Sequence, residues 1–215
     1  MDIEKKSLIR NKEMAVKELL PAIIWGLIIT IQAGLYILAI PYIFIEKIVR
    51  KQTFAEIGFR IKGLHKDLIK YWWLIVLPIG TGLASLFLSK IIVPDYFAHV
   101  IERTQPMLDF DNLLILIPQL FILALTEEIC FRGFFQRKLG ICINFRAAII
   151  ITSLIFALGH FSMGSPIVVL YDITWIFIDS IIYGILFYKT KSIYICWISH
   201  LLANLCGVFV LMIIQ

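Results

Sequence analysis

Two adjacent carboxylates, Glu127 and Glu128, lie inside an otherwise apolar stretch of the chain. A charged side chain near the centre of a membrane helix costs about 2.5–3.5 kcal/mol on insertion scales, so a protein keeps such a pair only where it neutralises or uses it. Arg132 follows Glu128 by one helical turn and can neutralise one of the two charges. Glu127 then has no cation of its own, and the sequence predicts a chemical role for it.

Three further polar residues in apolar runs, His160, His200 and Asn204, are expected at a similar depth. Counted from the basic end of each expected helix at ~1.5 Å per residue, Glu127 lies ~15 Å deep, His160 ~21 Å, His200 ~12 Å and Asn204 ~18 Å. Taken singly, each is more simply explained as an interhelical hydrogen-bonding group. Because they come from three separate helices and fall in one slab, together they predict a functional site.

The composition places this site in a membrane protein. The chain has 215 residues, of which 60% are hydrophobic and 16% charged, and its apolar residues form long runs. We expect an all-α, polytopic transmembrane helix bundle that forms a single membrane domain over residues 1–215. About six membrane helices are expected, at residues 21–45, 71–93, 113–136, 146–161, 166–188 and 193–214.

The basic residues gather beside the apolar runs and predict the orientation. Loops 46–70, 137–146 and 189–192 are rich in Lys and Arg, so the positive-inside rule places them in the cytoplasm. Segment 46–70 is expected on the membrane surface, and 94–112 is expected to be a polar loop. Lipid headgroups account for the net charge of +5, so no nucleic-acid partner is expected.

The first 20 residues leave one point open. They contain Lys5, Lys6, Arg10, Lys12 and Lys17 before an apolar run that is too long for a signal peptide, so the run 21–45 is interpreted as a retained first helix. The orientation above would put these basic residues outside. Either their four acidic neighbours weaken the effect, or the first helix does not cross fully.

Three short motifs occur in order on these helices. Residues 127–132 match EExxxR, residues 156–160 match FxxxH and residues 200–204 match HxxxN. In order and spacing the chain resembles the CPBP family of intramembrane proteases, which includes prenyl-protein CAAX endopeptidases and bacterial bacteriocin-processing or self-immunity proteins. The resemblance covers about residues 113–212, which would form the catalytic core helices.

The resemblance implies a role for each motif residue. Glu127 would be the general base that activates water, and His160 would hold the water or the oxyanion. His200 and Asn204 would orient water and stabilise developing negative charge. Glu128 with Arg132 would fix the local helix geometry.

Two aspartates on residues 166–188 stand outside the family pattern. Asp172 and Asp179 are seven residues apart and share one helix face. Asp179 is expected at the depth of the site, ~14 Å, and could orient a histidine as an outer carboxylate.

The metal content stays open at this stage. Glu127, His160 and His200 form an O/N/N ligand set of the kind that a catalytic Zn²⁺ uses. The ligands are scattered along the chain and HExxH is absent, and the same residues without metal would make a glutamate-type hydrolase.

We therefore expect a multi-pass protein of a bacterial plasma membrane that cleaves a hydrophobic or lipidated peptide or protein near the cytoplasmic leaflet. Bacteriocin maturation or self-immunity is favoured over prenyl-protein processing. A non-enzymatic immunity or scaffold protein and a proton-coupled transporter are the alternatives, although the chain has no internal repeats of the transporter kind. The sequence has neither the GxGD of aspartyl nor the GxSG of rhomboid-type intramembrane proteases.

Overall fold

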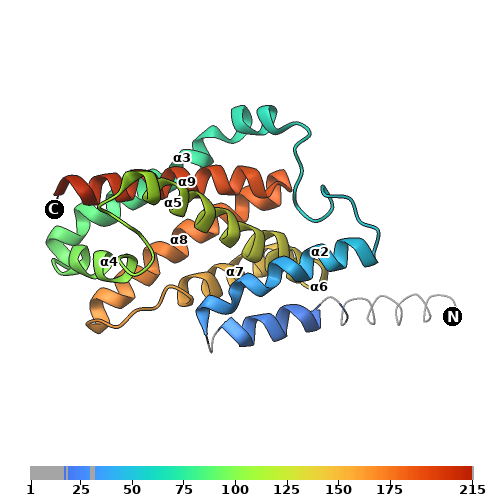
Figure 1. Ribbon diagram of the computed structural model, residues 1–215, viewed down its shortest axis with the longest axis horizontal. Coiled ribbons are helices and arrows are strands. Elements are labelled where there is room, and N and C mark those ends of the chain that lie inside the picture. The colour runs from blue at the N-terminus through green and yellow to red at the C-terminus, as the bar shows by residue number, and fades with distance from the viewer. Residues whose placement is uncertain (1–16, 18, 30–31, 215) are drawn as a thin grey trace, which may run out of the picture.

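The structure is a computed structural model that describes residue 17 and residues 19–29 and 32–214. Among these residues it contains helices and one isolated bridge, between Phe59 and Ser192, so the expected all-α fold is confirmed. The basic residues that precede Lys17, namely Lys5, Lys6, Arg10 and Lys12, lie outside the described residues. The elements are helix Leu19–Ile29, η1 (Ala33–Leu38), α2 (Ala39–Val49), α3 (Leu64–Ile92), α4 (Tyr96–Thr104), α5 (Leu113–Glu128), η2 (Ile129–Gln136), α6 (Arg137–Cys142), α7 (Phe145–Leu158), α8 (Pro166–Thr190) and α9 (Ile193–Ile214) (Figure 1).

Four helices in the described part of the chain are long and apolar enough to cross a membrane. Large apolar side chains stand on their outer surfaces, among them Ile91 at 83% exposure and Leu114 at 87%. Apolar surface on this scale is suited to lipid rather than water. The protein is therefore an integral membrane helix bundle. The four spans are Leu64–Ile92, Leu113–Cys142 (α5, η2 and α6 together), Pro166–Thr190 and Ile193–Ile213.

The other two expected spans are shorter than predicted. Helix α7 has 14 residues and ends at Leu158, so the expected helix 146–161 stops before His160. Gly159 continues into a turn, and the segment after it leads to Pro166 at the start of α8. At ~1.5 Å per residue, α7 covers ~21 Å, less than the hydrocarbon thickness of ~30 Å.

The expected first helix, 21–45, is wrong as a continuous element. The chain forms helix Leu19–Ile29, reverses, and continues through η1 into α2 (Figure 1). The polar residue Gln32 has extended backbone at the reversal (φ −147°, ψ 104°), and the indole Nε1 of Trp25 donates to the carbonyl of Tyr36 at 2.9 Å. The polar residue and this hydrogen bond thus replace the expected long span with a helical hairpin. We call this segment, helix Leu19–Ile29 together with η1 and α2, the N-terminal hairpin.

Only the last part of the surface segment expected at 46–70 is helical together with the span that follows it. Helix α3 begins at Leu64 and bends at Tyr71, whose backbone leaves the helical region (φ −113°, ψ 17°). The connection from α2 to α3 is fastened to the turn between α8 and α9, since Arg60 Nε donates to the Thr190 carbonyl at 2.7 Å.

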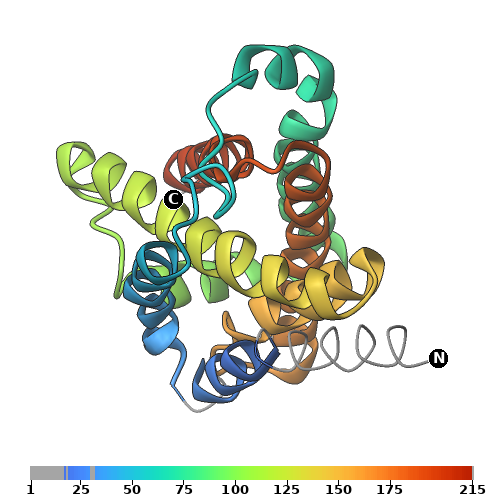
Figure 2. The ribbon, with the colours of Figure 1, turned by 90° about the vertical axis from the view of Figure 1, so that its right-hand side faces the viewer.

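The three loops rich in basic residues lie at one end of the bundle (Figure 2). Here the buried carboxylate of Glu46 on α2 binds Arg50 at 3.2 Å, Arg137 at 3.1 Å and the fully buried Lys138. These ion pairs join α2 to the end of the span Leu113–Cys142. The convergence agrees with the sequence grouping of these loops, and their cytoplasmic location remains a prediction.

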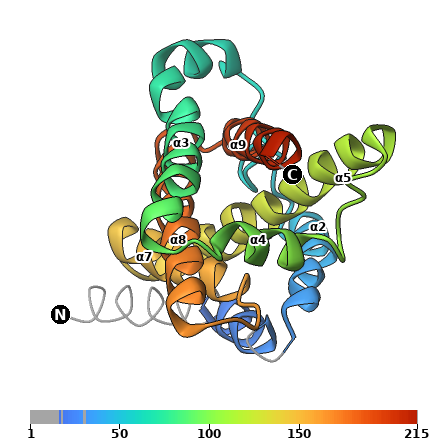
Figure 3. The same cartoon turned by 90° about the vertical axis from the view of Figure 1, so that its left-hand side faces the viewer.

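At the opposite end, the expected polar loop 94–112 contains a helix. Helix α4 lies across this end of the bundle beside α8 (Figure 3). Its buried face carries Tyr96, His99 and Val100, and the Tyr96 ring packs edge-on against Tyr171 of α8 at 4.9 Å between centroids. The loop prediction failed because the polar residues of a short amphipathic helix hid its periodic apolar positions.

Directly after the two glutamates the span Leu113–Cys142 changes to a π-helical stretch, η2, whose residues are all buried. Its Phe131, Phe134 and Phe135 surround Trp25 of the N-terminal hairpin, with ring centroids 5.1, 5.6 and 5.1 Å away. The hairpin thus packs against the span that carries Glu127 and Glu128, and this aromatic core fixes the span in place.

Candidate active site

Glu127 lies one residue before the end of α5, between two imidazoles. Its Oε1 is 3.9 Å from Nε2 of His160, and its Oε2 is 3.6 Å from Nε2 of His200. The histidines come from the turn after α7 and from α9, so three separate parts of the fold meet here. The sequence predicted that these three side chains converge, and the structure brings them together.

A cavity of about 230 Å³ has this group on its wall. Asn204 lines the same cavity from α9, one turn after His200. The side chain of Glu127 keeps 18% of its surface exposed, and His160 keeps 22%, so both can reach a molecule in the cavity. All four motif residues expected at the site therefore border one space.

A second cavity of about 290 Å³ adjoins the first. The two share Glu127 and His160, and the second continues to Gly34 and Tyr36 of the N-terminal hairpin. The Tyr36 hydroxyl lies 3.2 Å from the hydroxyl of Thr126, the residue before Glu127. We call the two adjoining cavities the chamber. The N-terminal hairpin thus forms part of its wall near the Glu127 carboxylate.

His200 is held in a single orientation. Its Nδ1 lies 2.9 Å from Oε1 of Glu128, and its ring stacks on Tyr183 with centroids 4.8 Å apart and planes 19° apart. An ionised carboxylate only accepts hydrogen bonds, so Nδ1 carries the proton and donates it. In the neutral ring Nε2 is then an acceptor, and it faces Glu127.

Glu128 is itself held by Arg132 in a fully buried ion pair. Arg132 Nη1 lies 3.2 Å from Glu128 Oε1, and both side chains are 0% exposed. Arg132 Nη2 also donates to the hydroxyl and carbonyl of Ser180 on α8, at 2.7 and 3.1 Å. The guanidinium lies over the rings of Phe156 and Tyr183, at 4.7 and 5.3 Å from their centroids. These contacts fix the carboxylate that orients His200.

His160 is oriented by the backbone. Its Nδ1 lies 2.8 Å from the carbonyl oxygen of Phe156, and its ring packs on the Phe156 ring at 4.6 Å. A carbonyl can only accept, so Nδ1 is the donor and the neutral ring presents an acceptor at Nε2. Both imidazoles therefore offer the same kind of atom to the space beside Glu127.

The two aspartates of α8 have different surroundings. Asp179 lines the first cavity, and its described hydrogen bond is from the Thr81 hydroxyl of α3. The carboxylate that contacts His200 is Glu128, in the position that the sequence suggested for Asp179. Asp172 instead forms an ion pair with Arg103.

The fit of a metal ion depends on whether the three candidate ligands can reach one point. Glu127, His160 and His200 offer suitable donor atoms, and Zn²⁺ would need each at about 2.0–2.2 Å. In the described part of the chain, however, no group of three or more His, Cys, Asp or Glu side chains is placed to hold a metal ion. Glu127 approaches the two rings through different oxygens, at 3.6 and 3.9 Å. The donor set is chemically suitable, but its arrangement is not that of a metal centre.

Chemically, this arrangement can hold and deprotonate a water molecule. A carboxylate and two neutral Nε2 atoms are three acceptors around one space, and a water has two hydrogens to give them. Asn204 adds an amide that donates as well as accepts. The buried charges of Glu128 and Arg132 balance each other. The charge of Glu127 is therefore left for the deprotonation of water.

Sequence reasoning missed two groups at the site, Tyr36 and Arg103. Both border the second cavity, and Arg103 also borders the first. Tyr36 lies inside the helix expected at 21–45, and Arg103 lies inside the polar loop expected at 94–112. The spacing of Tyr96, His99, Val100 and Arg103 at three or four residues, which is a helical period, could have revealed α4.

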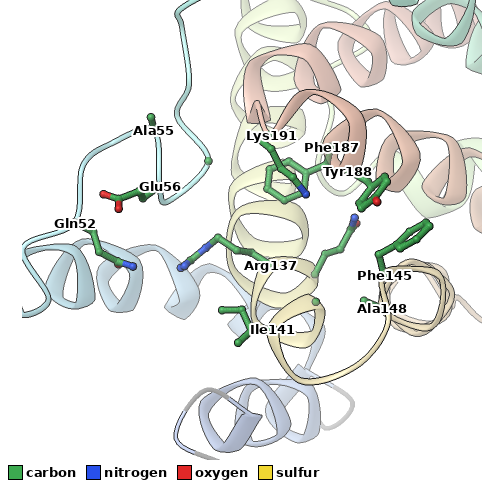
Figure 4. Close-up of a pocket in the computed structure, with 13 residues that line it drawn as sticks. Gln52, Ala55, Glu56, Arg137, Ile141, Phe145, Ala148, Phe187, Tyr188 and Lys191 are labelled. Carbon is green, nitrogen blue, oxygen red and sulfur yellow. The ribbon is translucent and has the colours of Figure 1, made fainter. Parts of the chain in front are cut away.

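A larger cavity, about 470 Å³, lies at the basic end and is separate from this site. Its wall includes Glu56, Arg137 and Lys191 together with the rings of Phe145 and Tyr188 (Figure 4). Those two rings stack with centroids 4.0 Å apart. No residue of the three motifs lines this cavity. The size of a cavity therefore does not locate the chemistry in this protein.

Comparison with known protein families gives a match over the second half of the chain. Residues 109–206 match the family described as type II CAAX prenyl endopeptidase Rce1-like. The matched segment contains all three motifs, and it begins after α4. Neither the curated proteins nor the solved structures gave a match.

Proposed function

We propose that the chain, whose residues 109–206 match the family of type II CAAX prenyl endopeptidases, hydrolyses a peptide bond with water activated by Glu127. The substrate is a hydrophobic or lipidated peptide or protein that reaches the site from the bilayer. The observation that carries the proposal is the approach of both imidazole Nε2 atoms to the Glu127 carboxylate, at 3.9 and 3.6 Å, on the wall of a cavity.

The proposed reaction begins with a water beside Glu127. The water donates one hydrogen to the carboxylate and the other to Nε2 of His160 or His200, which orients a lone pair toward the substrate carbonyl. Glu127 takes the proton as the C–O bond forms, and it returns that proton to the amine nitrogen as the C–N bond breaks. The products are a new carboxyl terminus and a free amine.

The oxyanion that forms during attack needs a hydrogen-bond donor. Both neutral histidines present acceptors at Nε2, because their Nδ1 protons are used by Glu128 and by the Phe156 carbonyl. We therefore assign the donor role to the amide of Asn204, and we assign the positioning of water to the two histidines. This differs from the roles that the family resemblance implied, where His160 could also hold the oxyanion.

The chamber supports an apolar substrate. Its wall is mainly apolar, and Leu123 and Met107 border both cavities. The family description names prenyl endopeptidases, so a peptide with a prenylated cysteine is the first substrate to test. An apolar group on the substrate would partition into the bilayer and deliver the peptide bond to the depth of Glu127.

The test is cleavage by purified protein in liposomes, with fluorogenic peptides that do or do not carry a prenyl group. Glu127→Gln keeps the size of the side chain and removes the base, so we expect cleavage to fall by about 10²- to 10⁴-fold. Glu102→Gln, which removes an exposed carboxylate on α4, is the matched control and should cleave normally. Equal cleavage by the Glu127→Gln variant and the wild type would refute the assignment of the base.

A role in bacteriocin maturation or self-immunity remains a prediction for the physiological setting. Cells that express the wild type or the Glu127→Gln variant at equal levels would be exposed to bacteriocin. An enzymatic role requires the variant to lose protection, whereas a scaffold would keep it. Proton uptake into liposomes that depends on a solute, without peptide cleavage, would instead support the transporter alternative.

A further inference from the structure

The cavity of about 470 Å³ at the basic end has an excess of positive charge on its wall. Arg137, which lines it, shares the buried carboxylate of Glu46 with two other cations. Lys191, also on the wall, forms no ion pair with a carboxylate of the described residues. The carboxylate on the wall, Glu56, accepts hydrogen bonds from the backbone N–H and the hydroxyl of Thr53, at 2.6 and 2.7 Å. The cavity therefore favours an anionic ligand.

The two cations can donate to the same anion. Arg137 Nε donates to the Gly133 carbonyl at 2.7 Å and Nη2 donates to Glu46 at 3.1 Å, whereas Nη1 is in no hydrogen bond with a described residue. Lys191 follows α8, and its Nζ lies 4.5 Å from the centroid of the Tyr188 ring. Both side chains line the one cavity (Figure 4). A guanidinium and an ammonium are the side-chain groups that bind phosphate oxygens in proteins.

The wall also contains a hydrogen-bond acceptor that lacks a donor. Gln136 is 5% exposed, and its Nε2 donates to the Gly184 carbonyl at 2.9 Å. This bond fixes the orientation of the amide, and Oε1 is then left without a hydrogen-bond partner among the described residues. An unpaired buried acceptor is unfavourable. A ligand that carries a hydroxyl beside its anionic group would supply the missing donor.

The cavity lies where two membrane spans end. Arg137 is near the end of the span Leu113–Cys142, and Lys191 directly follows the span Pro166–Thr190. Tyrosines at the ends of spans are typical of the headgroup region of a bilayer. Three large apolar or aromatic side chains of the wall are exposed, namely Ile141 at 55%, Phe145 at 39% and Tyr188 at 38%. The wall thus offers charge to a headgroup and apolar surface to an acyl chain.

We propose that this cavity binds an anionic glycerophospholipid whose headgroup carries hydroxyl groups. The phosphate accepts hydrogen bonds from Arg137 and Lys191, and a hydroxyl donates to Gln136 Oε1. The acyl chains leave past Ile141 and Phe145. The bound lipid joins the span Leu113–Cys142 to the turn between α8 and α9. The site is separate from the chamber, so the proposal goes beyond the endopeptidase function and does not depend on it.

The test measures the Kd of single lipids for the full chain in detergent micelles by native mass spectrometry. Phosphatidylglycerol has the phosphate and the hydroxyl groups, phosphatidylmethanol has the same charge without hydroxyls, and phosphatidylcholine has no net charge. We expect phosphatidylglycerol to bind about 5- to 25-fold more tightly than phosphatidylcholine, the range for one or two basic side chains that face an anionic lipid. It should bind about two- to tenfold more tightly than phosphatidylmethanol, the range for one neutral hydrogen bond.

Two variants with the same substitution locate the site. Lys191→Asn removes a cavity charge, and asparagine suits the left-handed backbone of this position (φ 52°), so the variant should fold. It should weaken binding of phosphatidylglycerol about fivefold and leave that of phosphatidylcholine unchanged. Lys66→Asn removes an exposed charge from the first turn of α3, outside the cavity wall, and should bind like the wild type.

Equal binding of phosphatidylglycerol and phosphatidylcholine would overturn the proposal, and so would an equal loss in Lys191→Asn and Lys66→Asn, because diffuse charge would then explain the binding. Equal binding of phosphatidylglycerol and phosphatidylmethanol would overturn the assignment of a hydroxylated headgroup. If soluble glycerol 3-phosphate displaces the lipid at equal concentration, the cavity is a site for a free phosphate compound and the lipid assignment fails. None of these measurements uses peptide cleavage, so their outcome is distinguishable from a failure of the proposed function.

Discussion

Replacement of Arg132 by methionine should destabilise the protein strongly. The structure buries Arg132 and Glu128 completely, 3.2 Å apart, with the guanidinium over two aromatic rings. Methionine keeps an unbranched apolar side chain of similar length and removes the charge. Glu128 is then left as a buried carboxylate with only the hydrogen bond from His200.

The magnitude follows from the burial. Removing one partner of a buried ion pair costs about 3–5 kcal/mol, because the other charge stays desolvated. We expect a loss of that size in the free energy of unfolding, which is a factor of about 150 to 5,000 in the ratio of folded to unfolded protein. Replacing both residues, in Glu128→Gln/Arg132→Met, removes the uncompensated charge, and about half of the loss or more should be recovered.

Reversible unfolding in mixed micelles of mild detergent and dodecyl sulfate, followed by tryptophan fluorescence, gives the required free energies. Arg132→Lys is a further variant that keeps the charge but loses the two-pronged contact with Ser180, and it should fall between the wild type and Arg132→Met. A loss below about 1 kcal/mol in Arg132→Met, the level of a surface ion pair, would refute the reasoning. So would a double variant that is less stable than the single one.

Three more outcomes are expected. Gly133→Ala should lower the free energy of unfolding by about 1–3 kcal/mol in the same assay, because an added Cβ would lie 2.7 Å from Cδ1 of Ile193. Ile193→Val removes that atom, so most of the loss should disappear in the double variant. Trp25→Phe keeps the aromatic packing but loses the hydrogen bond to the Tyr36 carbonyl. It should lower the free energy of unfolding by about 0.5–1.5 kcal/mol and speed proteolysis between the two helices of the hairpin. Unchanged proteolysis would show that this hydrogen bond does not hold the hairpin together. Peptide cleavage should persist after chelation and dialysis, with less than about 0.1 metal ion per chain by elemental analysis; loss of cleavage that returns with Zn²⁺ would contradict the metal-free mechanism.

The sequence predicted that Glu127, His160 and His200 lie close together, because polar groups inside membrane helices must face the protein interior. The structure brings the two Nε2 atoms to 3.9 and 3.6 Å from the Glu127 carboxylate, and the catalytic roles of these residues remain predictions. The Glu128–Arg132 pair followed from an i, i+4 spacing, and the structure contains it at 3.2 Å.

The remaining features depend on contacts between distant segments. Hydropathy reports only that residues 21–45 are apolar, and it does not show that the Trp25 indole fastens a reversal. Asp179 was suggested as the carboxylate that orients a histidine, but the carboxylate at Nδ1 of His200 is that of Glu128, and only packing between helices could show this. The pairing of Arg103 with Asp172 joins residues 69 positions apart on elements that have no shared motif.

The N-terminal hairpin borders the chamber without supplying any of the three motifs. This part of the cavity wall and the motif residues thus lie in different stretches of the chain, so selection can remodel one while the other is kept. Exchanging the first 50 residues for those of a distant relative should redirect which peptides are processed and leave the hydrolytic step intact.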